Sequence, residues 1–316
     1  MSKIVIMESL GISDSELAMR KKPFEEAGHT FVDYPKTTDT EKLIRQAKDA
    51  DAMIIANMPM PGEVISRCDN LKFIDVAFTG VDHVGLDAAK AKGIKVSNAS
   101  GYSNEAVSEL VLGMVLSIYR NMPQVEQRCR DGKTKDGLIG NELKGKTVGI
   151  VGLGNIGTRS AEIFNAFGCK ILRNSRTIHE NAPEYVKQVS LDELLQKSDI
   201  VVLHCPANRS TKGLINKEKL ALMKNSRILV NVARGPVVVS QDLADALNNG
   251  VIAAAAIDVF DKEPPLDLSE PLLNCKNCLV TPHVAFATEE SMSLRAEIVF
   301  KNLAAWLCDK QENIIL

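Results

Sequence analysis

The sequence predicts an α/β protein built from two doubly wound parallel sheets. Short runs rich in β-branched residues alternate with amphipathic stretches twice along the 316 residues, once before and once after Thr147. This alternation is typical of parallel strands that are covered by helices. A glycine-rich turn stands near the middle of the chain, so a region of domain size precedes it, and the length allows two domains.

The first hundred residues supply the elements of one sheet. The expected strands are residues 3–7, 30–33, 52–56, 73–77 and 95–98, and the expected helices are 15–27, 40–47 and 86–92. A long helical pattern then runs from Asn104 to Arg130, with apolar residues in a 3.6-residue period. We expect Ser103 to cap this helix and Pro123 to kink it.

The alternation restarts after Thr147 and predicts a second sheet. The expected strands are residues 148–151, 170–173, 200–204, 227–231, 252–258 and 279–281, and the expected helices are 155–167, 191–196, 217–223 and 240–248. Six strands with helices between them make a full doubly wound set. A last helix, 289–307, can return to the first domain. We therefore expect one discontinuous domain from residues 1–100 and 286–316, with a second domain, 101–285, inserted into it.

The composition argues against several classes of protein. A formal net charge of −2 favours neither nucleic acid nor an anionic membrane as a partner. No apolar stretch reaches membrane-spanning length, and the first residues lack the pattern of a signal peptide. Seven scattered cysteines predict reduced thiols in the cytoplasm. Cys275 and Cys278 have no second pair or histidine at ligand spacing, so we expect no metal site.

The turn in the middle of the chain has the spacing of a dinucleotide-binding motif. Residues 148–157 read V-G-I-V-G-L-G-N-I-G, which places Gly152, Gly154 and Gly157 in G-x-G-x-x-G between a strand and a helix. The first glycine permits the tight turn, the second lets a pyrophosphate approach the backbone, and the third lets helix and strand pack closely. The N–H groups and dipole of the following helix then favour phosphates.

Three ionisable residues follow successive strands of the second sheet. Arg234 comes after the fourth expected strand, Glu263 after the fifth and His283 after the sixth. A guanidinium can hold a carboxylate in a bidentate fork, and an imidazole beside a buried carboxylate can exchange a hydroxyl proton. Each residue alone is equally compatible with a structural ion pair, a polar loop or a hydrogen-bonded histidine. Together they predict hydride transfer at a carbon that bears oxygen.

Five segments, in this order, resemble the D-isomer-specific 2-hydroxyacid dehydrogenase family, in particular its glyoxylate and hydroxypyruvate reductases. They are the glycine turn, S-D-I-V-V-L-H-C-P (198–206), L-V-N-V-A-R-G-P-V-V (229–238), A-A-I-D-V-F-D-K-E-P-P (255–265) and L-V-T-P-H-V-A (279–285). The resemblance implies a Rossmann cofactor domain inserted into a flavodoxin-like substrate domain. It also implies an NAD(P)-dependent 2-oxoacid reductase of the short form, which lacks a regulatory domain.

The resemblance assigns roles to individual residues. Arg234 would bind the substrate carboxylate and keto oxygen, His283 would be the acid/base, and Glu263 would orient it. Asp258 would contact the nicotinamide carboxamide. The other cofactor-binding residues would be Gly152, Gly154, Asn155, Ile156, Gly157, Ser175, Arg176, His204, Pro206, Thr211, Val232, Ala233 and Ala285. The other substrate-binding residues would be Thr79 and Gly80, whose loop holds the carboxylate, and Asn57 and Met58, which line the side-chain pocket.

The residues after the second strand of the inserted domain favour NADP(H) over NAD(H). NAD-preferring members place an acidic residue about 20 positions beyond the glycines, to bind the ribose 2′-hydroxyl. This chain has Ser175 there, followed by Arg176, and both offer donors to a 2′-phosphate. The alternative is that Arg176 is a solvated surface charge and that either cofactor is accepted.

Three functions remain open. The favoured one is reduction of a small 2-oxo acid such as glyoxylate, hydroxypyruvate or pyruvate. The second is a 3-phosphoglycerate dehydrogenase, which needs a basic pocket for the phosphate. The third is a dinucleotide-sensing protein like the corepressors of this fold, which would need disordered tails and a basic cluster. Family resemblance also implies a homodimer, formed through the helix that begins at Asn104. His29, His83 and His179 are expected on loops or the surface.

Overall fold

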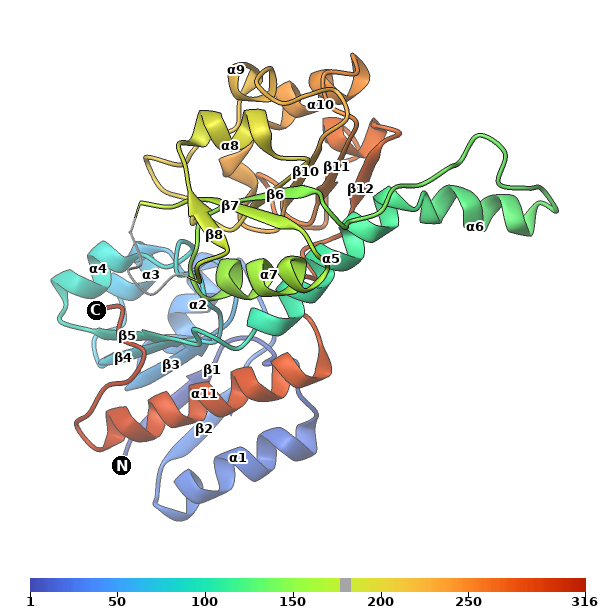
Figure 1. Cartoon of the computed structure of the whole chain (residues 1–316). Coiled ribbons are helices and arrows are strands. Elements are labelled where there is room, and N and C mark those ends of the chain that lie inside the picture. Colours follow the sequence, from blue (N-terminus) through green and yellow to red (C-terminus); the bar gives the residue numbers. More distant parts are fainter. Residues whose placement is uncertain (177–182) are drawn as a thin grey trace. The chain divides into compact units, whose positions relative to one another are not determined.

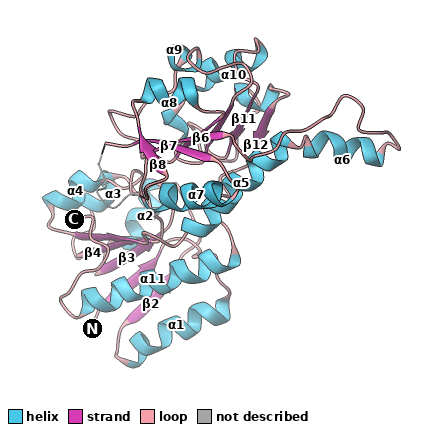
Figure 2. Ribbon diagram, in the orientation of Figure 1, coloured by secondary structure: helices cyan, strands magenta, loops and turns pink. Residues whose placement is uncertain are grey.

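The computed structural model describes residues 1–176 and 183–316. The chain divides into two compact units. Unit 1 comprises Met1–Ser103 and Ala287–Leu316, and unit 2 comprises Asn104–Phe286. Each unit has its own parallel sheet (Figures 1 and 2).

The sheet of unit 1 has the strand order of flavodoxin-like folds. Its order is β2-β1-β3-β4-β5, and every pair in it is parallel. The strands are β1 (Lys3–Ile6), β2 (Thr30–Asp33), β3 (Ala52–Ile55), β4 (Phe73–Val76) and β5 (Lys95–Asn98). The side chains of β3 and β4 are buried on both faces, as the continuous apolar runs predict.

Helices cover both faces of the unit 1 sheet (Figure 1). One face carries α1 (Asp14–Glu26) and α11 (Glu289–Leu307), and the other carries α2 (Thr40–Ala47), α3 (Gly62–Ser66) and α4 (Leu86–Ala91). Side chains fix the helix starts, since Ser13, Asp39 and Thr288 accept bonds from backbone N–H groups of the first turns. The five-residue helix α3 was not expected, because so short an element shows no helical period.

The sheet of unit 2 has seven parallel strands. Its order is β12-β11-β10-β9-β6-β7-β8. Read from β8 to β11, this is the Rossmann order 3-2-1-4-5-6, and β12 is a seventh strand beside β11. The strands are β6 (Thr147–Val151), β7 (Lys170–Asn174), β8 (Val186–Gln188), β9 (Ile200–Leu203), β10 (Ile228–Asn231), β11 (Ala254–Ile257) and β12 (Cys278–Val280). The α/β class with two doubly wound parallel sheets is therefore confirmed.

The expectation of six strands in this sheet is wrong. The strand that the sequence did not predict, β8, has three residues, and only Val186 is buried. It lies at the edge of the sheet beside β7, where one strand neighbour suffices. A short strand with two exposed side chains leaves no apolar run in the sequence.

Two apolar cores lie on opposite faces of the unit 2 sheet. Alternate strand residues belong to opposite cores, as for Val201 and Val202 in β9. One face carries α5 (Asn104–Tyr119) and α7 (Asn155–Ala166), and the other carries α8 (Leu191–Lys197), α9 (Lys217–Leu220) and α10 (Ser240–Asn248) (Figure 1). The sheet is therefore covered on both faces, as an all-parallel sheet requires.

The single kinked helix expected over 104–130 is wrong, because the structure has two helices there. Helix α5 ends at Tyr119, and α6 (Met122–Arg130) follows. The break lies before Pro123, at Asn121, whose φ of 51° is left-handed. Pro123 stands in the first turn of α6, where a missing N–H costs nothing. Helix α6 and the loop after it extend away from the unit 2 sheet, and α6 has no buried residue (Figure 1).

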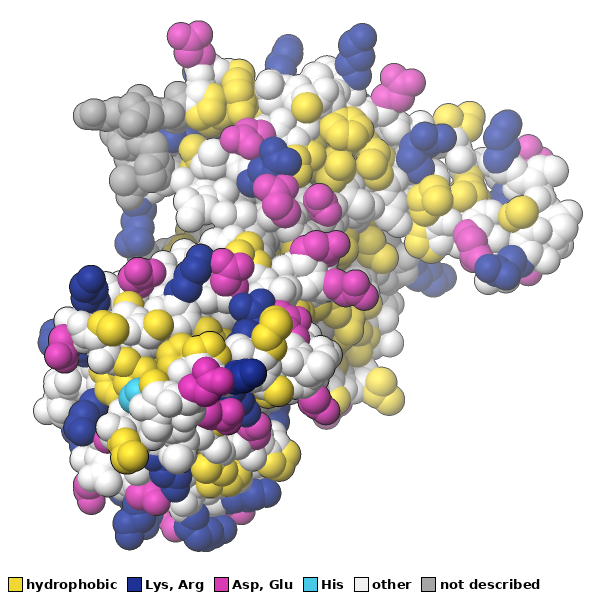
Figure 3. Space-filling model, turned by 90° about the horizontal axis from the view of Figure 1, so that it is seen from below, with side chains coloured by type: hydrophobic (Ala, Val, Ile, Leu, Met, Phe, Trp, Pro, Cys, Tyr) yellow, Lys and Arg dark blue, Asp and Glu magenta, His cyan; other side chains and the backbone are white. Residues whose placement is uncertain are grey.

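Charges of both signs are mixed on the surface. Figure 3 shows lysine and arginine side chains interspersed with aspartate and glutamate over the face that it draws. In the part of the chain that the structure describes, no helix is both long and apolar enough to cross a membrane.

Candidate active site

The predicted site residues of unit 2 follow six parallel strands, whose carboxyl ends lie at one edge of the sheet. They are Gly152, Gly154, Asn155, Ile156 and Gly157 after β6, Ser175 and Arg176 after β7, His204, Pro206 and Thr211 after β9, Val232, Ala233 and Arg234 after β10, Asp258 and Glu263 after β11, and His283 and Ala285 after β12.

The three glycines of the turn have different steric surroundings. A Cβ on Gly152, whose φ is +95°, would lie 2.7 Å from the Cys205 nitrogen, and one on Gly157 would lie 2.2 Å from the Gly152 oxygen. A Cβ on Gly154 would meet no atom within 4 Å. Two glycines therefore serve chain packing, whereas Gly154 borders open space at the start of α7 and supplies no side-chain cap. Backbone N–H groups facing such space fit a pyrophosphate.

Ser175 and Arg176 stand just beyond the end of β7, next to the strand that carries the glycine turn. Arg176 is exposed. Burial raises the pKa of the Cys205 thiol to about 11, and the nearby positive charge of Arg176 acts in the opposite direction. The charge of Arg176 is therefore close enough to affect Cys205, whose main chain packs against Gly152.

A chain of hydroxyl groups determines that Nε2 of His204 carries a proton. Ser160 donates to Ser108 at 3.1 Å, and Ser108 donates to the main-chain oxygen of Ile156 at 3.2 Å. Because the Ser160 proton is used in this way, the 2.9 Å contact between Ser160 Oγ and His204 Nε2 is a bond that the imidazole donates. Burial lowers the pKa of His204 to about 4, so the ring is uncharged near pH 7.

The loop that carries Arg234 is held by a buried asparagine that the sequence analysis did not single out. The Asn231 side chain, 1% exposed, donates to the Arg234 oxygen at 3.0 Å and accepts from the Ala233 nitrogen at 3.1 Å. The Arg234 guanidinium donates to the Ala233 oxygen at 2.8 Å. A Cβ on Gly235 would lie 2.0 Å from the Phe260 carbonyl carbon, so this glycine lets the β10 loop press against the β11 loop.

Asp258 connects β11 to the loop that carries His283. Its buried carboxylate accepts hydrogen bonds from Thr281 Oγ1 at 2.6 Å, from the Val284 nitrogen at 2.9 Å and from the Ala285 nitrogen at 3.0 Å. Burial raises the pKa of Asp258, against the lowering effect of these hydrogen bonds. The structure thus shows a role in positioning this loop, and contact with a nicotinamide stays a prediction.

Glu263 and His283 form a direct pair. Glu263 Oε2 lies 2.6 Å from His283 Nδ1. The main-chain N–H of His283 donates to the Asp258 main-chain oxygen at 2.8 Å. The backbone of His283 has a left-handed φ of 55°, which is uncommon for a residue with a side chain of this size. The expectation of a buried carboxylate beside the imidazole is wrong, because the Glu263 side chain is 51% exposed on its polar loop.

The remaining predicted cofactor residues differ in exposure. Pro206 is exposed, and its oxygen accepts from Thr211 Oγ1 at 2.5 Å, which closes the loop after β9. Val232, Ala233 and Ala285 are buried. Of the other histidines, His29 accepts from the Ser2 N–H, His83 packs edge-on against Phe78, and His179 lies outside the described residues.

In unit 1 the predicted substrate residues follow β3 and β4. Thr79 and Gly80 come after β4, and the buried Thr79 Oγ1 has no hydrogen-bond partner in the described part of the chain. Asn57 and Met58 come after β3. Asn57 is partly exposed, whereas Met58 is fully buried, so Asn57 is the more accessible of the two.

A buried carboxylate holds the loop after β3. Glu8 Oε1 accepts from the nitrogens of Ala56 and Met58, both at 2.8 Å. Lys36 Nζ lies 3.6 Å from Glu8 Oε2 and donates to Asn57 Oδ1 at 3.0 Å. The lysine beside Asn57 is therefore largely balanced by a negative charge.

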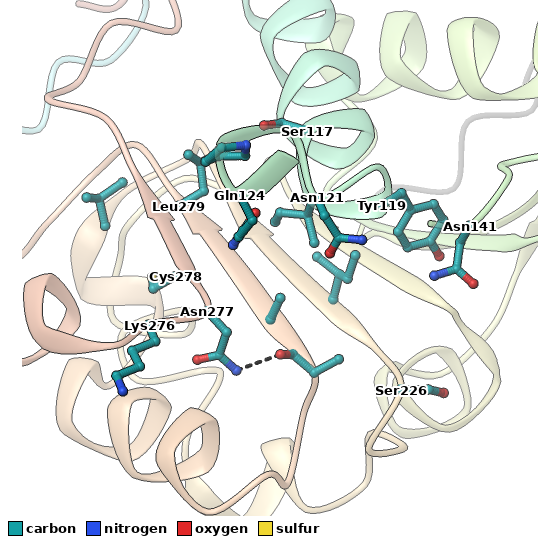
Figure 4. A pocket seen from close by; sticks show the side chains of 16 residues that line it. Ser117, Tyr119, Asn121, Gln124, Asn141, Ser226, Lys276, Asn277, Cys278 and Leu279 are labelled. Atoms are coloured by element: carbon teal, nitrogen blue, oxygen red, sulfur yellow. Dashed lines mark hydrogen bonds between the residues drawn. The ribbon is translucent and has the colours of Figure 1, made fainter. Parts of the chain in front are cut away.

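A cavity of about 470 Å³ lies at the opposite end of the unit 2 sheet, where β10, β11 and β12 begin (Figure 4). Its lining includes Ser117, Gln124 and Asn277, whose side chain donates to the Ala253 oxygen at 2.6 Å. It is separate from the strand ends that carry the predicted site. Among the described residues, no three histidine, cysteine, aspartate or glutamate side chains gather as a metal site requires.

The chain is similar to known proteins over its whole length. Residues 112–285 match the family model described as D-isomer specific 2-hydroxyacid dehydrogenase, NAD binding domain. A hydroxypyruvate reductase of Blautia hydrogenotrophica is 37% identical, over 99% of each chain. A glyoxylate reductase of Thermofilum pendens is 37% identical, over 94% of this chain and 89% of the relative. An acyclic imino acid reductase solved with NADPH and D-Arg is 27% identical, with a TM-score of 0.91 over 99% of this chain and 100% of the other.

Proposed function

Because the chain belongs to the D-isomer specific 2-hydroxyacid dehydrogenase family, and is thus an oxidoreductase that uses a nicotinamide dinucleotide, we propose that it reduces a small 2-oxo acid to the D-2-hydroxy acid. The observation that carries this proposal is the 2.6 Å contact between Glu263 and His283, on strand-end loops neighbouring that of Arg234. An oriented imidazole and a guanidinium at one sheet edge supply a proton and a countercharge for a keto oxygen.

The roles of the three residues follow from their contacts. His283 donates Nδ1–H to Glu263, so Nε2 is the atom that gives a proton to the keto oxygen. Glu263 holds the ring in this tautomer. Arg234 binds the carboxylate and stabilises the charge that develops on the keto oxygen. When bound, the reduced nicotinamide supplies the hydride that the keto carbon accepts.

The glycine turn and its neighbours would hold the cofactor. The N–H groups of Asn155 and Ile156 would bind the pyrophosphate beside Gly154, where the chain leaves open space. The neutral His204 would accept a hydrogen bond at Nδ1. Gly152 and Gly157 would shape the turn that receives the cofactor. Residues after the later strands would complete the contact; they are Pro206, Thr211, Val232, Ala233, Asp258 and Ala285.

We propose that NADP(H) is preferred over NAD(H). Ser175 and the exposed Arg176 stand where a carboxylate would otherwise bind the ribose, and Arg176 has its charge near the glycine turn. The test is titration of protein fluorescence with NADPH and NADH. Ser175→Asp should weaken NADPH binding more than tenfold and leave NADH binding similar, whereas Arg45→Ala, at an exposed arginine of α2, should change neither. Equal binding of both cofactors by the unmodified protein would refute the preference.

The substrate class rests on relatives and on unit 1. The two relatives described above are named for hydroxypyruvate and glyoxylate, and we propose that these acids or pyruvate are reduced. Thr79 and Gly80 would hold the carboxylate, with Asn57 and Met58 at the substrate side chain. A 3-phosphoglycerate dehydrogenase would need positive charge near Asn57, but Lys36 is balanced there by Glu8.

Turnover with NADPH and a panel of 2-oxo acids tests the function. We expect oxidation of NADPH with glyoxylate, hydroxypyruvate or pyruvate, and little with phosphohydroxypyruvate. Preference for the phosphorylated acid would favour the phosphoglycerate dehydrogenase. Tight cofactor binding without turnover on any acid would favour a dinucleotide sensor and would refute the proposal.

We also propose a homodimer formed through α5 and α6, in the cytoplasm. On α5, Gly113 is exposed with open space above it, between the partly buried Leu112 and Leu116. Helix α6 has no buried residue, and Met122 at its start is 51% exposed. All seven cysteines are free thiols, which supports a reducing compartment. Light scattering after size exclusion should give twice the chain mass, and a monomer at micromolar concentration would refute the dimer.

A further inference from the structure

Unit 1 contains a chain of side-chain amides that leads from the last residues of the sequence to the loop of Thr79 and Gly80. Its members are Asn98 at the end of β5, Asn302 on α11 and Asn313 in the segment after α11. Asn98 and Asn302 are 6% and 1% exposed. These residues do not enter the proposed proton or hydride chemistry.

The first link fixes a peptide plane. Asn98 Nδ2 donates to the Thr79 main-chain oxygen at 2.7 Å, and the Ala99 nitrogen donates to the Phe78 oxygen at 3.1 Å. The Thr79 carbonyl and the Gly80 N–H belong to one planar peptide group. Holding the oxygen therefore determines where the Gly80 N–H points.

The second link is an amide whose hydrogen-bonding groups are used on both sides. Asn302 Nδ2 donates at 3.0 Å both to the Asn98 main-chain oxygen and to Asp75 Oδ1, and Asn302 Oδ1 accepts from Asn313 Nδ2 at 2.8 Å. Burial raises the pKa of Asp75 well above its ordinary value. Removing one member of such a buried network leaves the others unsatisfied, which is costly.

The third link is the segment after α11, which lies against the edge strand β5. Ile314 pairs with Ser97 in an antiparallel bridge, and Ser97 Oγ donates to the Glu312 oxygen at 2.6 Å. The Asn98 nitrogen donates to the Asn313 oxygen at 3.1 Å. Asn313 has a φ of 50°, a conformation that asparagine and glycine adopt most readily. Its side chain can therefore turn toward Asn302 while its backbone pairs with β5.

We propose that Asn98, Asn302 and Asn313 are positioning residues for substrate binding, which orient the Thr79–Gly80 peptide that receives the substrate carboxylate. The inference rests on the proposed function of that loop. It adds that the affinity for the 2-oxo acid depends on the Asn313 amide, which the segment after α11 brings to Asn302. A purely structural role would instead lower stability without a selective effect on substrate.

The test compares two changes in the same segment. Asn313→Gly keeps the left-handed backbone and removes the amide that reaches Asn302. Ser97→Ala removes another side-chain anchor of the segment, beside that of Gln311, but does not remove a side-chain amide. For each variant we would measure KM and kcat with glyoxylate, NADPH binding by fluorescence, and the midpoint of thermal unfolding. Asn302→Asp, which keeps the side-chain size but loses the amide donor, is the second variant should Asn313→Gly unfold.

We expect Asn313→Gly to raise KM about tenfold, with kcat within twofold and NADPH binding unchanged. Ser97→Ala should lower the unfolding midpoint at least as much as Asn313→Gly does, with KM near that of the unmodified protein. An equal rise of KM in both variants, or a loss of stability in Asn313→Gly without a change in KM, would overturn the inference. If the unmodified protein reduces no 2-oxo acid, the proposed function itself fails, which is a different outcome.

Discussion

Units 1 and 2 share a doubly wound parallel sheet but differ in what stands at their strand ends. In unit 2 these ends carry ionisable side chains, and the contacts around Asp258, Glu263 and His283 involve carboxylates. In unit 1 the loop after β4 presents backbone, and uncharged amides such as Asn98 and Asn302 hold it. On the proposed function, one architecture would thus support two kinds of site, one that provides charge and protons and one that orients a main-chain N–H group.

This difference makes the two units separable by experiment. Changes to charged groups in unit 2 should act on turnover, because charge develops in the transition state. Changes to the amides of unit 1 should act on substrate affinity, because a misdirected N–H group weakens binding to the acid before the reaction.

Arg234→Ala should greatly lower turnover. Removing a donor that stabilises an oxyanion costs about 10²–10³ in turnover. We expect this loss in kcat with glyoxylate, with NADPH binding unchanged, because the glycine turn is on a different strand end. A matched control is Arg45→Ala, at an exposed arginine of α2. A kcat of Arg234→Ala within threefold of normal would mean that unit 2 does not supply this charge.

Gly154→Ala and Gly157→Ala separate cofactor binding from folding. A Cβ on Gly154 meets nothing in the chain, so we expect an unchanged unfolding midpoint and at least tenfold weaker NADPH binding. A Cβ on Gly157 would lie 2.2 Å from the Gly152 oxygen, so that variant should lose stability as well. Calorimetry and fluorescence titration measure both effects. Normal NADPH binding by Gly154→Ala would show that the space beside this glycine is not the phosphate site.

His204 should make stability depend on pH. Its pKa falls from 6.5 in the unfolded chain to about 4 in the folded protein, so the unfolded state binds the additional proton between these values. Stability is therefore fully present above about pH 6.5 and is lost as the pH falls toward 4, by at most roughly 3 kcal/mol. Urea unfolding at pH 5 and pH 7 should show a smaller difference for His204→Gln. An identical pH dependence in that variant would contradict the neutral assignment.

Asp75→Asn should change stability less than His204 does, and Asp75 makes stability depend on pH in the opposite direction. Burial raises the pKa of Asp75, so the folded protein retains a proton that the unfolded chain releases, and stability decreases as the pH rises above the ordinary value. Asparagine does not titrate and can still accept from Asn302. We expect a higher unfolding midpoint for the variant at pH 7.5 and a difference that shrinks toward pH 4. A lower midpoint at pH 7.5 would show that unit 1 does use a charge here.

The sequence predicted the parts of the fold whose signals are local. Buried strands such as β3 and β9 are continuous apolar runs, and α11 has both its cap and its period in the sequence. Strand β8 was not predicted, because it lies at the sheet edge and has only one buried side chain, which leaves no apolar run in the sequence. The division into α5 and α6 was not predicted, because the break depends on the left-handed backbone of Asn121. The sequence pattern was instead interpreted as one helix with a kink at Pro123.

Candidate site residues could be named from the sequence where an ionisable side chain directly follows a strand. Arg234, Glu263 and His283 are ionisable residues just after strands, and the structure brings the last two into contact. The supporting residues were harder to find, because Asn231, Ser160 and Asn302 act through partners that are distant in sequence or through main-chain atoms. No local pattern distinguishes such a residue from an ordinary buried polar side chain.

On the proposed function, His283, oriented by Glu263, provides the proton for reduction of a 2-oxo acid. The most direct test is the rate of NADPH oxidation with glyoxylate in a single turnover, compared between the unmodified protein and His283→Ala, with NADPH binding measured on the same samples. We predict a rate about 10²–10⁴-fold lower with unchanged binding, typical of the loss of a general acid. A near-normal rate in the variant would contradict the account.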